Sequence, residues 1–258
     1  MQHTVTDLLM RMRLVDPASP RLVWHGREGR IELSGRVFDN WVAKTSNLLV
    51  DELDAGPGTV VELDLPPHWK SLAMAVACWQ VGCIVEVPQV RRDAASPRTH
   101  ADILMTHRGV PDLAPPQLLV CVALGSLAFR WDGVLPRAAV DYAAEVRSQG
   151  DVFLGDPDHA GRPEELLTSG GAPLAAGQLD RSITEPSPVE PDSELAELAD
   201  PEAPGTLLLE PGSRLLPALS AALLAWRRDS VLVLVEEGVE VTATMLSGER
   251  ITARLAPA

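Results

Sequence analysis

Apolar side chains recur every three to four residues in the first part of the chain, a spacing that predicts amphipathic helices. The first such stripe comprises Val5, Leu8, Leu9 and Met12. A second helix is expected after Ser34, with one stripe made of Phe38, Trp41, Val42, Thr45, Leu48 and Leu49. Residues 21–25 and 30–33, which lie between the two helices, are expected to form a hairpin that turns near 26–29.

A strand, a helix and a second strand are expected next, at residues 60–65, 68–81 and 83–87. Glycine and proline mark their limits, because Gly56–Pro57–Gly58 stops the preceding helix, Gly82 closes the new one and Pro88 ends the last strand. This order of elements predicts parallel strand pairing with helices that cover the sheet. Weaker signals indicate strands at 102–106 and 117–123, and a helix at 141–148.

A weak ungapped duplication relates the two halves of the chain. Residues 57–59 (PGT) recur as residues 204–206, so the offset is 204 − 57 = 147 residues. At this offset, strand 60–63 lies over 207–210, helix 68–81 over 215–228, and Trp79 over Trp226. Chance similarity between two strand–helix–strand units is one interpretation. A true duplication predicts two similar α/β subdomains, residues 1–150 and 151–258, with a pocket at their interface.

Composition and charge exclude several classes of protein. The formal net charge of −14 argues against binding to nucleic acid or to anionic membranes, both of which need basic surface. Apolar runs are too short for a membrane span or for a signal-peptide core. Cys78, Cys83 and Cys121 form no CxxC pair, which suits reduced thiols in a cytoplasmic protein. Residues 184–205 hold seven acidic residues, five prolines and no Lys or Arg, as expected of a solvated linker or an acidic docking element.

Residues 31–88 resemble the opening of adenylate-forming enzymes, the acyl-CoA synthetase or AMP-binding superfamily. The matching positions are Leu33–Ser34, Gly56–Pro57–Gly58, Leu65–Pro66–Pro67, Val81–Gly82 and Val87–Pro88. The whole chain is similar to short actinobacterial relatives of the N-terminal lobe of these enzymes, through DNWVAKTSNLL, LPPHWK and DYAAEVRSQGD. The resemblance implies an α/β fold of two similar subdomains with mostly parallel sheets covered by helices, without the C-terminal lobe.

The phosphate loop of that family, of the type TSGTTGxPK, has one counterpart here, Thr168, Ser169, Gly170 and Gly171. A glycine-rich backbone can donate several N–H groups to phosphate oxygens, so a degenerate loop could still bind ATP or AMP with magnesium. The segment is short, however, and lacks the second Thr and the Lys. The alternative is a hairpin that corresponds, within the repeat, to the first hairpin near residues 29–35.

Three further groups of residues carry two interpretations each. The first is a metal site or a plain turn at Asp156, Asp158 and His159. The second is a helix cap with core packing, or a ligand contact, at His68 and Trp69. The third is an anion site or a set of solvated loop side chains at Arg91, Arg92, Arg98, His100 and Arg108.

The resemblance assigns no catalytic residue and no metal ligand, because the family's adenine-binding motif, Thr–Glu pair, ribose-binding Asp and catalytic Lys have no counterpart. We therefore expect a binding or scaffolding pseudoenzyme with a cleft for a nucleotide or acyl ligand. One alternative is an AMP-forming acid–thiol ligase, like an acyl-CoA synthetase, that uses a reduced site or a partner subunit. Another is a structural or regulatory homodimer. The expected partners are a second copy or another protein chain, with no nucleic acid and no membrane.

Overall fold

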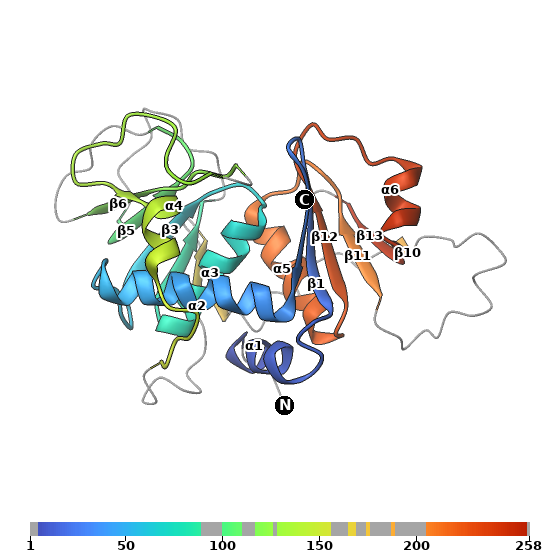
Figure 1. The fold of residues 1–258 in the computed structure, drawn as a ribbon, viewed down its shortest axis with the longest axis horizontal. Helices are drawn as coiled ribbons and strands as arrows, with labels where there is room; N and C mark the ends of the chain where they lie inside the picture. The colour runs from blue at the N-terminus through green and yellow to red at the C-terminus, as the bar shows by residue number, and fades with distance from the viewer. Residues whose placement is uncertain are drawn as a thin grey trace.

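The computed structural model describes residues 5–88, 100–109, 117–125, 128–155, 165–168, 174–175, 187–188 and 205–256. They form two sheets with helices between them (Figure 1). Sheet A contains β1 (Pro20–Gly26), β2 (Gly29–Ser34), β10 (Ser187–Pro188), β11 (Thr206–Leu209), β12 (Val231–Val235) and β13 (Ala253–Leu255). Sheet B contains β3 (Val60–Asp64), β4 (Ile84–Val87), β5 (Ile103–Thr106), β6 (Leu118–Cys121), β7 (Val140–Asp141), β8 (Glu165–Thr168) and β9 (Leu174–Ala175).

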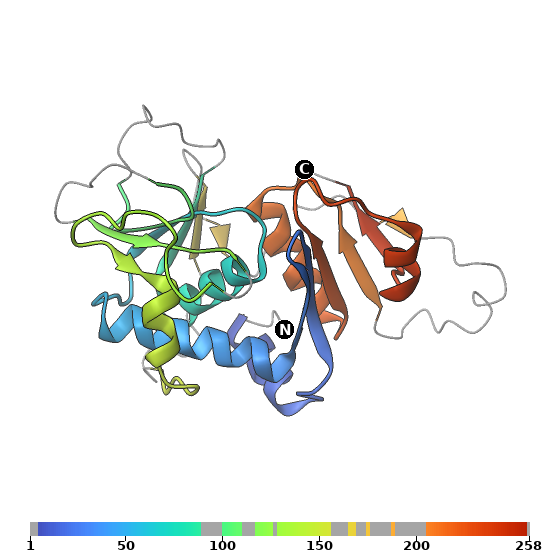
Figure 2. The same cartoon turned by 45° about the horizontal axis from the view of Figure 1, so that its top comes forward.

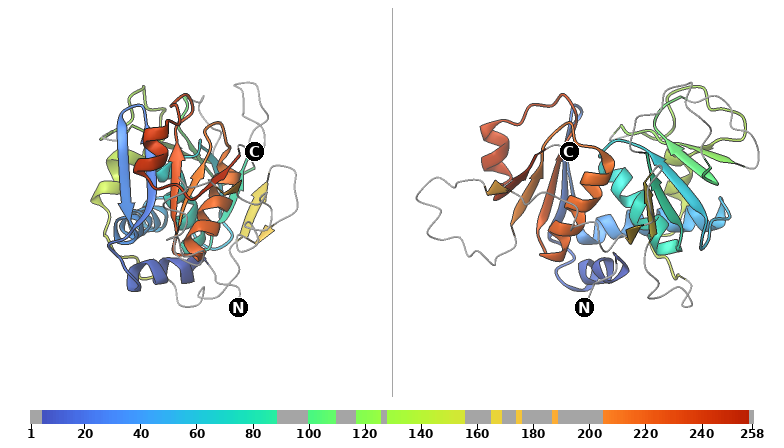
Figure 3. Two further views of the ribbon diagram at one scale, coloured as in Figure 1. Left: turned by 90° about the vertical axis from the view of Figure 1, so that its right-hand side faces the viewer. Right: turned by 180° about the vertical axis from the view of Figure 1, so that it is seen from behind.

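Helices α3 (Trp69–Val81) and α5 (Leu215–Arg227) lie between the two sheets, as the view from behind in Figure 3 shows. Helix α2 (Gly35–Asp51) runs beneath α3, and α1 (Val5–Leu14) packs against α2, α3 and α5. The remaining helical segments are α4 (Tyr142–Glu145), the 3₁₀ turn Val146–Ser148 and α6 (Ala243–Gly248). One apolar core joins the facing surfaces of both sheets to these central helices, through residues such as Leu22, Phe38, Leu63, Leu72 and Leu219.

The two sheets repeat one arrangement of five strands. Sheet B has the order β5-β3-β4-β8-β9, and sheet A has the order β13-β11-β12-β1-β2. In each set the first four strands are parallel and the fifth is antiparallel to its neighbour. The β1–β2 hairpin thus stands beside β12, as Figure 3 shows at left, in the place that β8–β9 takes beside β4. The predicted fold class of two similar, mostly parallel α/β units is confirmed.

The offset of 147 residues reappears in the hydrogen bonds that end α3 and α5. The N–H of Gly82 donates to Trp79 O at 3.1 Å, and the N–H of Asp229 donates to Trp226 O at 3.1 Å. The next N–H groups reach one residue further back, from Cys83 to Cys78 O at 2.8 Å and from Ser230 to Ala225 O at 2.9 Å. Both turns need a left-handed residue, which is Gly82 in one unit (φ 89°) and Asp229 in the other (φ 54°). The predicted correspondence of the two strand–helix–strand units is confirmed, while a true duplication stays a prediction.

Several other predictions can be compared with the structure. The N-terminal helix, the first hairpin, and the units β3–α3–β4 and β11–α5–β12 lie where the sequence indicated. The predicted helix 141–148 is one α-helical turn followed by a 3₁₀ turn. Both sheets take strands from either side of residue 150, and the division into 1–150 and 151–258 stays a prediction. No helix among the described residues is long and apolar enough to cross a membrane, while a cytoplasmic location stays a prediction.

Candidate functional site

A cavity of about 490 Å³ lies at the carboxyl ends of the parallel strands of both sheets. This edge is where open α/β sheets bind their ligands. The sheet B wall comprises residues 63–67, 87–88, 107–108 and Leu124. The sheet A wall comprises Trp24, Arg27, and residues 209–210, 212–215 and 234–238. The two walls include equivalent segments of the two units. Residues 65–67 lead from β3 toward α3, and residues 212–214 lead from β11 to α5.

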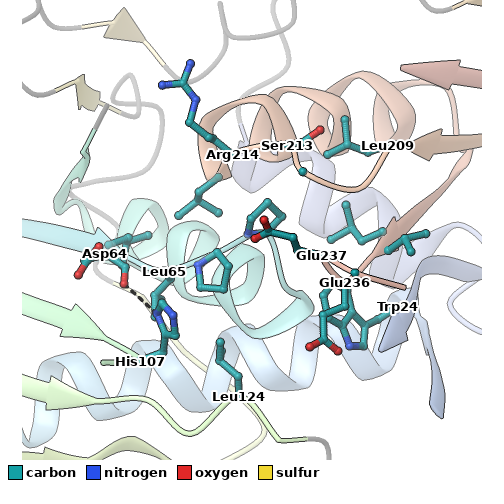
Figure 4. Close-up of a pocket in the computed structure, with 18 of the residues that line it drawn as sticks. Trp24, Asp64, Leu65, His107, Leu124, Leu209, Ser213, Arg214, Glu236 and Glu237 are labelled. Carbon is teal, nitrogen blue, oxygen red and sulfur yellow. Dashed lines mark hydrogen bonds between the residues drawn. The ribbon is translucent and has the colours of Figure 1, made fainter. Parts of the chain in front are cut away.

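On the sheet B wall, a buried carboxylate joins the ends of two neighbouring strands. Asp64 ends β3 and lies opposite Thr106, the last residue of β5. Thr106 Oγ1 donates to Asp64 Oδ2 at 3.2 Å, and Arg108 Nη2 donates to Asp64 Oδ1. His107 Nδ1 lies 3.3 Å from the carbonyl oxygen of Asp64, the bond drawn in Figure 4. Both oxygens of the Asp64 carboxylate are therefore engaged, and the guanidinium of Arg108 is fixed at the edge of the cavity.

The sheet A wall holds most of the negative charge of the cavity. Glu210 follows β11 and pairs with Arg254 of β13. Ser213 Oγ donates to the carbonyl oxygen of Glu210 at 2.8 Å, in the turn that leads into α5. Glu236 and Glu237 follow β12 and lie across the cavity from Asp64 and His107 in Figure 4.

Trp24 and Arg27 of the β1–β2 hairpin line one side of the cavity. The hairpin stands beside β12, as Figure 2 shows. The N–H of Arg27 donates to Glu236 Oε2 at 2.8 Å, and Arg27 Nη2 donates to the carbonyl oxygen of Glu237 at 3.0 Å. The indole of Trp24 packs directly over Gly26, also in β1. A Cβ atom added at Gly26 would lie only 2.6 Å from Trp24 Nε1. A glycine at this position therefore lets Trp24 form part of the wall.

Below the cavity, the start of α3 contains two buried titratable side chains. His68 is the N-cap of α3, and its Nδ1 accepts a hydrogen bond from the Lys70 N–H at 3.1 Å. Burial and the nearby charge of Lys70 hold the pKa of His68 well below its usual range. Lys70 Nζ donates to Ala123 O at 2.7 Å and to Gly125 O at 2.9 Å, and burial lowers its pKa to about 8. Lys70 thereby fixes the segment that carries Leu124, a residue of the sheet B wall.

The structure settles some of the sequence-based hypotheses. The capping and packing interpretation of His68 and Trp69 is confirmed, because both side chains are buried and His68 caps α3. Of the basic cluster, Arg108 lines the cavity and His100 is exposed, while Arg91, Arg92 and Arg98 lie outside the described residues. Asp156, Asp158 and His159, and nearly all of the acidic segment 184–205, also lie outside the described residues. No group of three or more His, Cys, Asp or Glu side chains in the described part of the chain could hold a metal ion.

The candidate phosphate loop is described only at its first residue. Thr168 ends β8 and lies opposite Val87, a residue of the sheet B wall, whereas Ser169, Gly170 and Gly171 lie outside the described residues. Strands β8 and β9, which flank the segment, pair antiparallel as β1 and β2 do, and the hairpin interpretation of the segment itself stays a prediction. Phosphate binding by the loop stays a prediction.

Sequence reasoning missed two of the residues that shape this site. Lys70 was not singled out, because a lysine in the first turn of a helix is ordinarily exposed. The pairing of Asp64 with Arg108 depends on the register of β3 and β5, which lie about 40 residues apart and are joined through weakly patterned chain. The resemblance of the 65–67 segment to its family counterpart and the pocket expected between the two subdomains were signals that pointed to this edge.

Comparison with solved structures places the fold. Acyl-CoA synthetase of Brucella canis superposes with a TM-score of 0.65 at 15% identity, over 96% of this chain and 47% of that chain. The N-terminal subdomain of Klebsiella oxytoca NpsA, in complex with anthranilyl-AMSN, gives a TM-score of 0.58 at 11% identity, over 97% of this chain and 60% of that chain. The chain therefore spans about half the length of the Brucella enzyme, and its fold is that of the N-terminal lobe of adenylate-forming enzymes.

Sequence comparison is more specific. The chain matches no protein-family model. A TIGR03089 family protein of Mycobacterium tuberculosis (strain ATCC 25618 / H37Rv) is 34% identical over 197 residues, which cover 72% of this chain and 79% of the relative. The predicted kinship with an actinobacterial protein is thus confirmed, and the chain belongs to the TIGR03089 family.

Proposed function

We propose that this protein binds a small molecule in the cavity between sheets A and B and forms no adenylate by itself, which makes it a pseudoenzyme. The observation that carries the proposal is the cavity's position at the carboxyl ends of the strands of both units. Its volume of about 490 Å³ lies in the range of small-molecule sites. Its walls combine apolar side chains such as Leu63, Leu65 and Leu234 with a few charged ones.

A related lobe supports binding without a second lobe. The NpsA N-terminal subdomain holds anthranilyl-AMSN, and its fold covers 97% of this chain. The N-terminal lobe of this fold can therefore present a small-molecule site by itself. We extend that property to the present chain, with a nucleotide or acyl compound as the ligand class.

The charges of the cavity do not fit a triphosphate. Its described lining carries four carboxylates and three guanidiniums, which gives 3 − 4 = −1, and the four carboxylates are Asp64, Glu210, Glu236 and Glu237. One of the guanidiniums, Arg27, is paired with Glu236 of the same wall. Adenylation requires cationic groups aimed at the α-phosphate as charge moves. We therefore assign no ATP-dependent or magnesium-dependent step to this cavity.

A second candidate, an AMP-forming acid–thiol ligase that acts with a partner subunit, is supported by the position of Thr168. The backbone of Thr168 lies beside Val87 of the cavity wall. In this candidate the partner would supply the missing cationic groups. The predicted homodimer, or a complex with another protein chain, stays a proposal, and a mass measured in solution at several concentrations would test it.

The test combines thermal unfolding with pyrophosphate exchange. The ligands are ATP, AMP, coenzyme A and octanoate, each with and without magnesium. A ligand at about 100 times its Kd adds about 2.7 kcal/mol to the stability of the folded state, which raises the midpoint by a few degrees. We expect AMP or octanoate to raise it and no ligand to support exchange. Exchange by the pure protein would overturn the pseudoenzyme proposal and favour the ligase.

A matched pair of variants tests whether the cavity is the site. Leu124 is half-buried on the sheet B wall, so Leu124→Trp should fill the cavity and abolish the shift. Leu135 is 39% exposed and lies outside the lining, so Leu135→Trp makes the same change of side chain elsewhere and should retain the shift. An unchanged shift in Leu124→Trp would place the ligand at another surface.

A further inference from the structure

The two walls of the cavity differ in charge. The sheet A wall has three carboxylates, Glu210, Glu236 and Glu237, against two guanidiniums, Arg27 and Arg214. The sheet B wall has one carboxylate, Asp64, together with Arg108 and His107. Both Asp64 oxygens accept hydrogen bonds, from Arg108 Nη2 and from Thr106 Oγ1. An anionic group in the cavity would therefore be repelled by the sheet A wall and accepted at the sheet B wall.

Arg108 is held in a fixed position for such a contact. Its carboxylate partner Asp64 is almost completely buried, and Thr106 beneath that carboxylate is fully buried. The backbone N–H of Arg108 donates to Thr106 Oγ1 at 3.2 Å, so both ends of the residue are tied to the same pair of strands. A guanidinium presents five N–H donors in a planar fork that matches carboxylate and phosphate oxygens. Fixed geometry of this kind reduces the entropy lost on binding.

We infer that Arg108 determines the specificity of the cavity, by binding an anionic group, carboxylate or phosphate, at one end of an otherwise apolar ligand. The inference rests on the proposed function, since it requires that the cavity bind a small molecule. Asp64 and Thr106 act as positioning residues. The apolar part of the ligand lies along Leu65, Pro66 and Leu124 of the same wall.

The similarity of the two units provides a matched control. Arg254 of β13 pairs with Glu210, and Arg108, which follows β5, pairs with Asp64; both carboxylates line the cavity, but Arg254 lies outside its lining. Arg108→Gln and Arg254→Gln therefore each remove one carboxylate–arginine pair. Only the first removes a guanidinium from the cavity wall.

The experiment follows the indole N–H signal of Trp24 by NMR during titration, because Trp24 lines the cavity. The Trp24→Phe variant assigns that signal among the six tryptophans. The probes are octanoate with octan-1-ol, and AMP with adenosine, so each anion has an uncharged counterpart. We expect one anion to shift the signal with an affinity at least about tenfold above its counterpart, and Arg108→Gln to remove that difference. A preference for octanoate over octan-1-ol would identify a carboxylate as the bound anionic group. A preference for AMP over adenosine would identify a phosphate.

The remaining outcomes are distinguishable. Arg254→Gln should retain the anion preference while its midpoint of unfolding confirms a folded protein. Equal binding of charged and uncharged probes, or an anion preference that survives Arg108→Gln, would overturn the role of Arg108 and leave the cavity as a binding site. A Trp24 signal that no probe shifts would overturn both this inference and the proposed function.

Discussion

Asp64 and Glu210 lie at the carboxyl ends of β3 and β11, and each carboxylate pairs with one arginine: Asp64 with Arg108, which follows β5, and Glu210 with Arg254 of β13. The pairs differ in burial. The side chains of Asp64 and Arg108 are 10% and 33% exposed, and those of Glu210 and Arg254 are 19% and 39% exposed. Asp64 also accepts a hydrogen bond from the buried Thr106. Both carboxylates line the cavity, but of the two arginines only Arg108 does, and Arg254 holds β13 against β11.

This difference predicts unequal costs when each carboxylate is removed. Asp64→Ala removes the carboxylate that accepts from Arg108 and from the fully buried Thr106 hydroxyl, so we expect a loss of about 1–3 kcal/mol in the free energy of unfolding. Glu210→Ala breaks a more exposed pair, and should cost at most about 1 kcal/mol. Urea unfolding at pH 7 measures both. A Glu210→Ala loss equal to or larger than that of Asp64→Ala would contradict the assigned burial.

A second prediction concerns the buried contact between Tyr142 and Thr45, whose oxygens are 2.8 Å apart. Thr45 Oγ1 donates to the carbonyl oxygen of Trp41 at 2.8 Å, so the Tyr142 hydroxyl is the donor to Thr45. Tyr142→Phe removes that donor and should cost about 1 kcal/mol. Thr45→Val strands the buried hydroxyl of Tyr142 and should cost about 1–3 kcal/mol. In urea unfolding, a larger loss for Tyr142→Phe than for Thr45→Val would reverse the donor assignment.

A third prediction concerns Gly26. An added Cβ would lie 2.6 Å from Trp24 Nε1 and 3.0 Å from Glu236 Oε2, so the indole must move. Gly26→Ala should therefore destabilise the protein by about 1–3 kcal/mol and change the Trp24 indole signal in NMR spectra. Gly56→Ala is the control, because nothing lies within 4 Å of its added Cβ. An unchanged indole signal in Gly26→Ala would show that Trp24 is positioned differently.

A fourth prediction concerns pH. Burial lowers the pKa of Lys70 to about 8, below its value of 10.5 in an unfolded chain. Between these pH values the unfolded chain binds more protons than the folded chain, so this group raises stability as pH increases from about 8 to 10.5 and adds no slope below that window. Lys70→Met removes the titrating group, so the variant lacks this contribution to the pH dependence of stability. Urea unfolding of both proteins across this window should give a smaller slope for the variant, and equal slopes would contradict the lowered pKa.

The repeated unit was predictable because its signals are local. Gly82 and Pro88 bound α3 and β4, and the spacing of Leu72, Val76 and Trp79 marks the buried face of the helix, so the sequence alone defines β3–α3–β4. The recurrence of PGT and of Trp226 then predicted β11–α5–β12. The short elements β7, α6 and β13 were not predicted, because they contain too few residues to show a periodic pattern. Strand β13, for example, has three residues and is positioned by its pairing with β11.

The candidate site was harder to predict because it depends on contacts between distant segments. The parallel pairing of Leu22 with Leu232 joins β1 to β12 in sheet A, although the two residues are about 210 positions apart in the sequence. No local pattern specifies this pairing. This pairing brings Trp24 and Arg27 into the cavity wall. In the sequence, Arg108 belongs to a basic cluster that could be an anion site or a set of solvated side chains. The register of β3 and β5 brings Arg108 into contact with Asp64, and this contact favours the anion site.

The central claim is that the cavity between the sheets binds small molecules. The most direct measurement is a fragment screen by saturation-transfer NMR against the wild-type protein, Leu124→Trp and Leu135→Trp. We expect fragments whose signals are present with the wild-type protein and with Leu135→Trp, and are lost with Leu124→Trp. The same fragments bound by all three proteins, or none bound by the wild-type protein, would contradict the claim.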